Sequence, residues 1–301
     1  MTSRCPTECG SAEEITTTPE GRTKKSVTGS QHGSEQPRTA VFGKLRIPLR
    51  NAEETEAIRR AGRVVANVLD VARQACSPGM TTAELSDICL AEIRRHGAES
   101  LFRGYRRGKL PPFPGDVCIS VNEQVVHGIP GERIIREGDL VKVDCGVRLN
   151  GWCGDGARSI LVGRTDEKLR KLVDATRNVL ALAVDMMQPG TPWSDIALAM
   201  ETAAAATGFG IVLDYVGHGV GRELHEPPKV PAFATGWDWK FDFVLRPGMV
   251  LAVEPMLTAG SPRVESLPDG WTVATCDGGF AAHEEHTIAL TERGASILTR
   301  M

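Results

Sequence analysis

Apolar residues recur with the period of a helix in two regions of the chain. In the first region, Ile58, Val65 and Leu69 fall on one face of a helix predicted over residues 51–76. Pro78-Gly79 interrupts the pattern, and a second, shorter helix is predicted to follow. This region therefore predicts two helices joined by a tight turn.

The second region repeats this arrangement. A helix is predicted over residues 165–187, and Pro189-Gly190 ends it. Thr191 is the expected N-cap of the next helix, with Pro192 in its first turn. The repetition indicates an internal duplication, although two unrelated helix pairs would give the same short match.

Segments with the composition of strands follow each pair of helices. They cover residues 117–126 and 140–162 in the first half, and residues 212–215 and 249–253 in the second. Two halves of helix–helix–strand order predict an α+β fold. In this fold the helices pack outside a curved antiparallel sheet, and a pseudo-twofold axis relates the halves.

The N-terminal part of the chain has a different composition. Residues 1–45 are rich in Ser, Thr, Glu, Gly and Lys and contain few large apolar side chains. Such a segment cannot bury enough surface to offset the entropy lost on ordering. We therefore expect a flexible extension over residues 1–45 and a folded domain over residues 46–301.

Two aspartates lie in a predicted β-hairpin. Asn150-Gly151 between two apolar runs is a strong signal for a tight turn, and this turn places Asp155 opposite Gly146. Asp144 is then a diagonal neighbour of Asp155 on the same face, close enough to share a cation. Buried carboxylates repel each other unless a cation lies between them, so we favour a metal site over two exposed aspartates.

Three further segments place an acid or a histidine in apolar or glycine-rich surroundings. His218 stands between glycines, Glu254 ends an apolar run and Glu285 begins one. With Asp144 and Asp155 they form a set of four carboxylates and one imidazole. Oxygen-rich sets of this kind suit divalent manganese, iron, cobalt or zinc, and four carboxylates nearly balance the charge of two such ions.

The order and spacing of these five residues resemble those of type I methionine aminopeptidases, which have the pita-bread fold. His127, which precedes Gly-Ile-Pro, and His225, which precedes Glu-Pro-Pro, match the family as well. The segment between His218 and Glu254 has no room for the additional helical subdomain of type II enzymes. The resemblance makes residues 46–301 the catalytic domain.

The resemblance implies an enzyme that removes the initiator methionine of nascent proteins when the second residue is small. Asp155 and Glu285 would bridge two divalent ions, Asp144 would complete the coordination of one ion, and His218 and Glu254 that of the other. A water shared by the ions would become the nucleophile.

The family pattern implies roles for other groups in the reaction. Glu254 would also pass a proton to the leaving amine. His127 and His225 would hydrogen-bond the substrate amide and the tetrahedral intermediate. We assign the metal ligand to Glu285 and expect its neighbour Glu284 to point the other way.

The implied methionine pocket is lined by Phe113, Cys118, Leu224 and Trp271, an apolar set that suits an unbranched thioether. Three residues depart from the family pattern. Leu224 replaces an aromatic residue, Phe113 replaces a tyrosine, and His283 replaces a glutamine near the metals. These departures bear on specificity rather than on the metal ligands.

The basic segment 101–115 is longer than the family pattern predicts. We interpret it as a solvated loop, with transient contact to ribosomal RNA as the alternative. The net charge of −3 gives no reason to expect sequence-specific nucleic-acid binding. No apolar run approaches the length of a membrane span, and no secretory signal is evident. We therefore expect a cytoplasmic monomer.

The eight cysteines are expected to be free thiols. A zinc site at Cys5 and Cys9 would lack further ligands at suitable spacing. Three alternatives to the methionine aminopeptidase remain. One is a proline-specific pita-bread aminopeptidase or dipeptidase, although such enzymes carry a folded N-terminal domain. Another is a non-catalytic pita-bread binding protein, although such proteins lack ligands that are present here. The last is a scaffold in which the acids coincide by chance.

Overall fold

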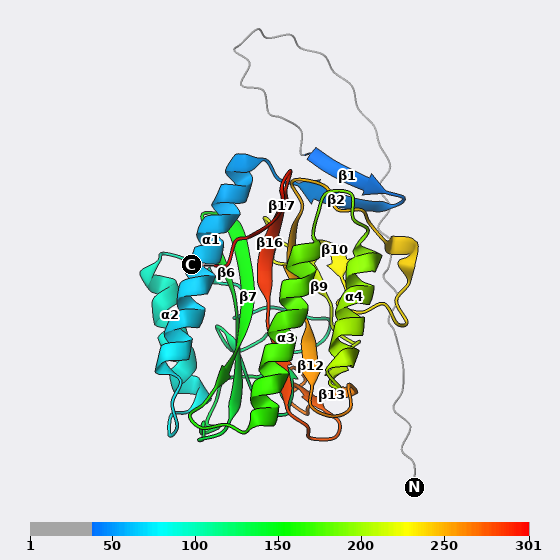
Figure 1. Cartoon of the computed structure of the whole chain (residues 1–301). Coiled ribbons are helices and arrows are strands. Elements are labelled where there is room, and N and C mark those ends of the chain that lie inside the picture. The colour runs from blue at the N-terminus through cyan, green and yellow to red at the C-terminus, as the bar shows by residue number, and fades with distance from the viewer. Residues whose placement is uncertain (1–37, 301) are drawn as a thin grey trace, which may run out of the picture. The chain divides into compact units, whose positions relative to one another are not determined.

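The computed structural model describes residues 38–300, and in this range helices flank a set of short antiparallel sheets (Figure 1). The helices are α1 (Ala52–Ala75), α2 (Thr82–Arg95), α3 (Glu167–Met186) and α4 (Trp193–Ala206), with a short 3-10 helix η1 (Trp239–Phe241). The cysteines of the rejected zinc site, Cys5 and Cys9, lie outside the described residues.

Two sheets contribute most of the strands around the centre of the fold. The first has the order β3 (Glu99–Ser100), β6 (Leu140–Leu149) and β4 (Cys118–Val121), with β7 (Trp152–Leu161) also paired to β6. The second has the order β10 (Glu226–Val230), β9 (Gly217–Gly219), β11 (Val250–Val253), β16 (His286–Thr291) and β17 (Gly294–Ile297).

Two three-stranded sheets and a hairpin complete the set. One sheet has the order β15 (Ala281–His283), β12 (Met256–Thr258) and β8 (Gly210–Ile211), and the other the order β13 (Val264–Ser266), β14 (Val273–Thr275) and β5 (Gln124–Val126). The hairpin consists of β1 (Arg38–Phe42) and β2 (Leu45–Leu49).

The β6–β7 hairpin has the register that its turn predicts. Asn150 and Gly151 have φ values of 51° and 77°, as a type I′ turn requires, and Gly146 pairs with Asp155. Helix α1 packs closely on this hairpin (Figure 1). A Cβ atom on Gly154 would lie 2.7 Å from the Gly62 nitrogen of α1, so only glycine permits this approach.

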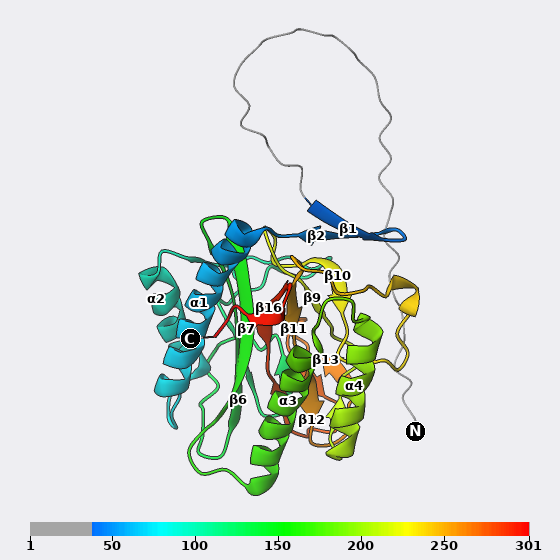
Figure 2. The same cartoon turned by 45° about the horizontal axis from the view of Figure 1, so that its top comes forward.

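The second helix pair covers the other half of the strands. Helix α3 lies against β12 and β15, and α4 lies against β8 (Figures 1 and 2). Their apolar faces form the largest buried cluster, in which the Trp193 and Phe243 rings stack with centroids 5.9 Å apart. Both helix pairs thus pack on the outside of the strands, as predicted.

The start of α4 differs from the sequence expectation. Thr191 was the expected N-cap, but Pro192 holds that position and its side chain forms no capping bond. Asp242 replaces the cap from a distant part of the chain, since its carboxylate accepts bonds from the Ser194 N–H at 3.1 Å and the Ser194 hydroxyl at 2.7 Å. A cap supplied by tertiary contact leaves no local sequence signal.

Two other expectations need adjustment. The strand predicted over residues 212–215 is instead β8 at Gly210–Ile211, because Leu213 and Asp214 form an exposed bend that leads towards β9. The expected domain boundary at residue 45 falls within the β1–β2 hairpin. Ala40 and Ile47 of this hairpin are buried in the cluster beneath α3 and α4, so residues 38–45 belong to the folded part of the chain.

Candidate metal centre

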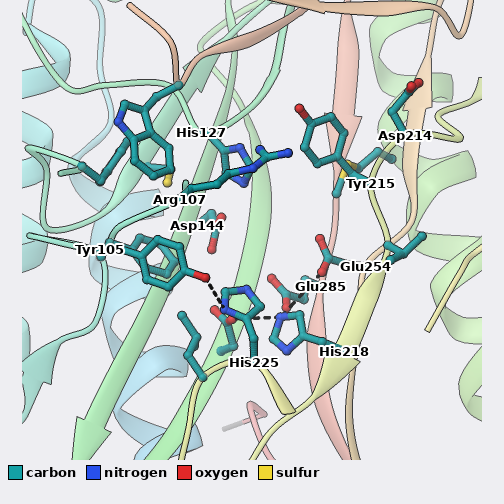
Figure 3. A pocket seen from close by; sticks show the side chains of 18 residues that line it. Tyr105, Arg107, His127, Asp144, Asp214, Tyr215, His218, His225, Glu254 and Glu285 are labelled. Atoms are coloured by element: carbon teal, nitrogen blue, oxygen red, sulfur yellow. Dashed lines mark hydrogen bonds and ion pairs between the residues drawn. The ribbon is translucent and has the colours of Figure 1, made fainter. Parts of the chain in front are cut away.

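Asp144 and Asp155 lie on the paired strands β6 and β7 and line one pocket. Figure 3 shows Asp144 directed into it. The backbone of Asp155 is fixed from the second sheet, because its N–H donates to the Thr287 hydroxyl at 3.0 Å and its carbonyl accepts from that hydroxyl at 2.7 Å. The Gly156 N–H also donates to Asp155 Oδ1 at 3.0 Å. One oxygen of this carboxylate therefore remains for a further ligand.

His218 comes from β9, where two glycines allow close packing of strands. A Cβ atom on Gly217 would collide with the Ala252 carbonyl, and one on Gly219 with the Pro227 carbonyl. His218 Nδ1 lies 3.0 Å from its neighbour's carbonyl oxygen and donates to it. This bond leaves the Nε2 lone pair directed at the acids, the arrangement typical of metal-binding imidazoles.

Glu254 and Glu285 complete the cluster from the second half of the fold. His218 Nε2 lies 3.6 Å from Asp155 Oδ2 and 3.8 Å from Glu254 Oε1. One ligand atom from each of Asp155, His218 and Glu285 lies within 4.8 Å of the others. The five predicted ligands therefore converge from β6, β7, β9 and the ends of β11 and β16.

The neighbouring residues Glu284 and Glu285 point in different directions. Glu284 points away from the cluster, accepting bonds from Arg177 Nε at 3.0 Å and the Ser159 N–H at 3.2 Å. Glu285 faces the other acids, and its Oε1 is buried without a hydrogen-bond partner within residues 38–300. A buried carboxylate oxygen with no donor fits a bound cation.

The negative charges of the clustered carboxylates repel one another. Burial and neighbouring carboxylates raise the pKa of Asp144 and of Glu285 well above their usual ranges. Burial, opposed by His218, raises the pKa of Asp155 to about 7. Burial also acts on Glu254, but the His283 and His218 imidazoles outweigh it and lower its pKa. The oxygen-rich donor set suits divalent cations, and a bound cation would stabilise the ionised form of these buried carboxylates.

His127 and His225 lie on opposite sides of the acids (Figure 3). Burial lowers the pKa of each to about 4, so both rings are neutral near physiological pH. The Tyr105 hydroxyl and His225 Nδ1 are 3.1 Å apart, and His127 Nδ1 is buried with no hydrogen-bond partner in the part of the chain that the structure describes. Both rings are thus placed to bond a ligand that enters the pocket.

The pocket has a volume of about 270 Å³, and every residue predicted for the site lines it. These residues are Phe113, Cys118, His127, Asp144, Asp155, His218, Leu224, His225, Glu254, Trp271 and Glu285. His283 does not line it but approaches Glu254 Oε2 with its Nε2 at 3.6 Å. The structure therefore brings the whole predicted set together.

Known proteins are similar to this chain over the part of the sequence that contains the five proposed ligands. The model of Metallopeptidase family M24 matches residues 56–292. Methionine aminopeptidase 1 of Bacillus subtilis is 42% identical over 255 residues, which span 85% of this chain and 100% of that protein. The chain belongs to Metallopeptidase family M24.

Other relatives support membership of the M24 family. The methionine aminopeptidase of Escherichia coli is 37% identical over 257 residues, covering 85% of this chain and 94% of that protein. The crystal structure of methionine aminopeptidase from Thermotoga maritima has a TM-score of 0.80 and 41% identity, and it covers 85% of this chain and 100% of that one. The predicted pita-bread fold and metallopeptidase class are confirmed.

Solved structures of lower identity are similar to this chain in fold alone. Prolidase from Pyrococcus furiosus has a TM-score of 0.66 at 23% identity, and this chain covers 65% of it. Within residues 38–300, no helix is both long and apolar enough to cross a bilayer.

Seven further residues line the pocket, and the sequence did not predict them. They are Phe102, Tyr105, Arg107, Asp214, Tyr215, Val216 and Met256. Asp214 to Val216 directly precede the His218 strand, a position that could have pointed to the site. Tyr105 and Arg107 belong to the basic segment that we interpreted as a solvated loop, and its lack of periodicity gave no signal of their position.

Proposed function

We propose that this chain is a methionine aminopeptidase that removes the N-terminal methionine of nascent polypeptides with a small second residue. Four convergent carboxylates and His218 beside an apolar slot are the observation that supports this activity most directly. The names of the chain's relatives point to the same reaction. Two divalent ions, manganese, iron, cobalt or zinc, are proposed as cofactors.

Each ligand has a distinct proposed role. Asp155 and Glu285 would hold both ions, Asp144 would complete the coordination of one, and His218 and Glu254 that of the other. Bound ions of this kind supply a nucleophile from water at neutral pH and polarise the scissile carbonyl. Four carboxylates nearly cancel the charge of two such ions, whereas one ion would leave an uncompensated negative charge in a buried site.

The remaining polar groups would act on the substrate itself. Glu254 lies among the ligands and beside the pocket, so it can accept a proton from water and donate it to the leaving amine. Neutral His127 and His225 would each donate an N–H to the substrate amide and to the oxygen of the tetrahedral intermediate. Their low pKa favours donation without adding charge to the site.

An apolar slot beside the metal ligands would take the methionine side chain. Phe113, Cys118 and Trp271 form a buried cluster, with the Phe113 and Trp271 rings edge to face at 5.4 Å. Leu224 lies at the same pocket and adds a flexible aliphatic wall. A thioether fits such surroundings because it is unbranched and polarisable.

Peptide hydrolysis tests the proposal directly. Protein reconstituted with manganese or cobalt should cleave Met-Ala-Ser and should leave Ala-Pro peptides intact, whereas a proline-specific enzyme would show the reverse preference. A non-catalytic binding protein would cleave neither peptide. Metal analysis of the purified protein should find two divalent ions per chain, and fewer than one ion with no rescue of activity would refute the proposed mechanism.

We also propose that the enzyme acts as a cytoplasmic monomer. Arg106 and Lys109 are exposed on the segment 101–115 and would supply the transient contact with ribosomal RNA. Replacing both by glutamine should weaken salt-dependent ribosome binding. Unchanged binding would remove this contact from the proposal without affecting the peptidase activity.

A further inference from the structure

The segment from Phe102 to Phe113 forms a loop that is closed by backbone bonds at one side of the pocket. The Gly104 N–H donates to the Phe113 carbonyl at 2.8 Å, and the Phe113 N–H donates to the Tyr105 carbonyl at 2.9 Å. The Tyr105 N–H donates to the Phe102 carbonyl at 2.9 Å. These bonds join the two ends of the loop, so the residues between them have a defined position.

Side chains anchor the same loop to the rest of the fold. Arg103 and Asp116 form an ion pair at 2.5 Å, and Trp271 Nε1 donates to the Pro111 carbonyl at 2.9 Å. The Tyr105 ring lies 5.4 Å from the His225 ring. The basic segment is therefore part of the pocket wall rather than a free solvated loop.

Arg107 extends from this loop across the pocket (Figure 3). Its guanidinium carbon lies 5.8 Å from the centre of the Tyr215 ring, a cation–π distance. Within residues 38–300, the guanidinium forms no hydrogen bond or ion pair. Its donors therefore remain available to a ligand in the pocket.

The distance from the reacting groups defines which part of a substrate would meet Arg107. The His127 ring lies 5.4 Å from the Tyr215 ring, so His127 and Arg107 both lie within 6 Å of that one side chain. An extended peptide advances about 3.4 Å per residue. If His127 bonds the amide near the scissile bond, the guanidinium reaches groups on the second or third residue.

Resting on the proposed function, we propose that Arg107 is a specificity-determining residue that binds a carboxylate on the second or third residue of the substrate. The carboxylate is either the free carboxyl terminus of a short peptide or an acidic side chain at the third position of a longer chain. Guanidinium is suited to this role because it pairs with a carboxylate through two parallel hydrogen bonds.

Asp214 opposes this preference. It lines the same pocket, is exposed, and in Figure 3 its carboxylate is turned away from the metal ligands. A negative charge near the rim repels a substrate carboxylate and weakens its pairing with Arg107. Asp214→Asn should therefore increase the preference for acidic substrates.

The kinetic test compares matched acidic and neutral peptides. Met-Ala-Ser is paired with its carboxamide, and Met-Ala-Asp-Ser carboxamide with Met-Ala-Asn-Ser carboxamide. The natural chain should favour the acidic member by about two- to fivefold in kcat/KM, chiefly through KM, as expected for an exposed ion pair. Arg107→Gln should reduce this ratio to about one, and added salt should reduce it in the natural chain.

Arg106→Gln is the matched control, since this neighbouring residue does not line the pocket. It should leave both ratios unchanged. If Arg107→Gln lowers the acidic-to-neutral ratio of kcat/KM for the tripeptide pair alone, the ligand is the carboxyl terminus. If it lowers the ratio for both peptide pairs, Arg107 also binds acidic side chains. Ratios that stay unchanged in Arg107→Gln would overturn the proposal, as would an equal loss for the acidic and neutral members.

A binding measurement separates this inference from the proposed activity. Calorimetric titration of metal-free protein with Met-Ala-Ser and with its carboxamide needs no turnover. The natural chain should bind the acid more tightly, and Arg107→Gln should remove the difference. Failure of every variant to cleave peptides would refute the proposed function, whereas equal binding of acid and carboxamide by the natural chain would refute the role of Arg107.

Discussion

The side chains of Glu284 and Glu285 show how adjacent identical residues take on different tasks. Glu284 pairs with Arg177 at 3.0 Å, and burial, opposed by this arginine, raises its pKa to about 7. Glu285 lacks a donor at Oε1 and faces other acids. The first residue therefore stabilises the fold, while the second requires a cation.

Replacing Glu285 by glutamine should abolish activity without unfolding the protein. The amide keeps the volume but removes a charge and a bridging ligand, so turnover of Met-Ala-Ser should fall by about a thousandfold or more. The metal-free variant should unfold at an equal or higher temperature, because a neutral amide costs less to bury than a carboxylate. Glu284→Gln is the control and should keep turnover within several-fold of the natural chain.

His283 should position Glu254. Its side chain is 1% exposed, and among the described residues neither ring nitrogen has a hydrogen-bond partner, with Glu254 Oε2 the nearby acid at 3.6 Å. His283→Ala should lower kcat about tenfold and weaken metal binding, since a supporting group is lost. His283→Gln restores a donor and should recover most of the activity. Equal losses in the two variants would show that packing, rather than the donor, matters.

A residue's position could be predicted where the neighbouring sequence determines it. Asp144 and Asp155 could be placed from the Asn150-Gly151 turn, because a tight turn fixes the register of its hairpin. The positions of His127 and His225 came from the family resemblance alone. Distant contacts position Arg107 and Tyr105, and such contacts leave no pattern in the nearby sequence.

At the scale of elements, close packing of α1 sets the position of the hairpin that supplies both aspartates. Gly62 of α1 faces the C-terminal strand region as well as β7, since a Cβ atom there would lie 2.5 Å from the Leu298 carbonyl oxygen. The helices were predictable because apolar periodicity is local. The Asp242 cap of α4 was not, because it depends on a residue nearly fifty positions away.

Gly62→Ala should destabilise the protein by about 1–3 kcal/mol, because the added methyl group forces α1 away from the backbone of Leu298 and Thr299. Denaturant unfolding would measure this loss. Gly131→Ala is a suitable control, since no atom lies within 4 Å of a Cβ there and φ is not positive. Equal stability of the two variants would contradict the close packing described for α1.

At the scale of the whole molecule, metal binding and folding stability should be linked through pH. The folded-state pKa of Asp155 and of Glu284 is raised to about 7, and burial and neighbouring carboxylates raise those of Asp144 and Glu285 well above their usual ranges. A carboxyl group with a raised folded-state pKa stabilises the fold below its unfolded pKa and loses this contribution as pH rises through the folded value. Metal-free protein should therefore lose stability at alkaline pH.

The comparison is made between about pH 6.5 and pH 8, where histidines with lowered pKa are already neutral in the folded state. Chelated protein should need less urea to unfold at the higher pH. Excess manganese should reverse this trend, because deprotonated ligands bind the ion more tightly. A chelated protein equally stable at both values would contradict the charge repulsion inferred for the cluster.

The ligands are distributed over both halves of the fold, and this has a consequence for when activity can begin during synthesis. A polypeptide translated only as far as α4 possesses Asp144 and Asp155 but lacks His218, Glu254 and Glu285. Such an intermediate offers only two of the five proposed ligands, a set too small to retain transition ions in competition with other cellular binders. Newly made molecules should therefore remain inactive until translation and folding of the second half are complete.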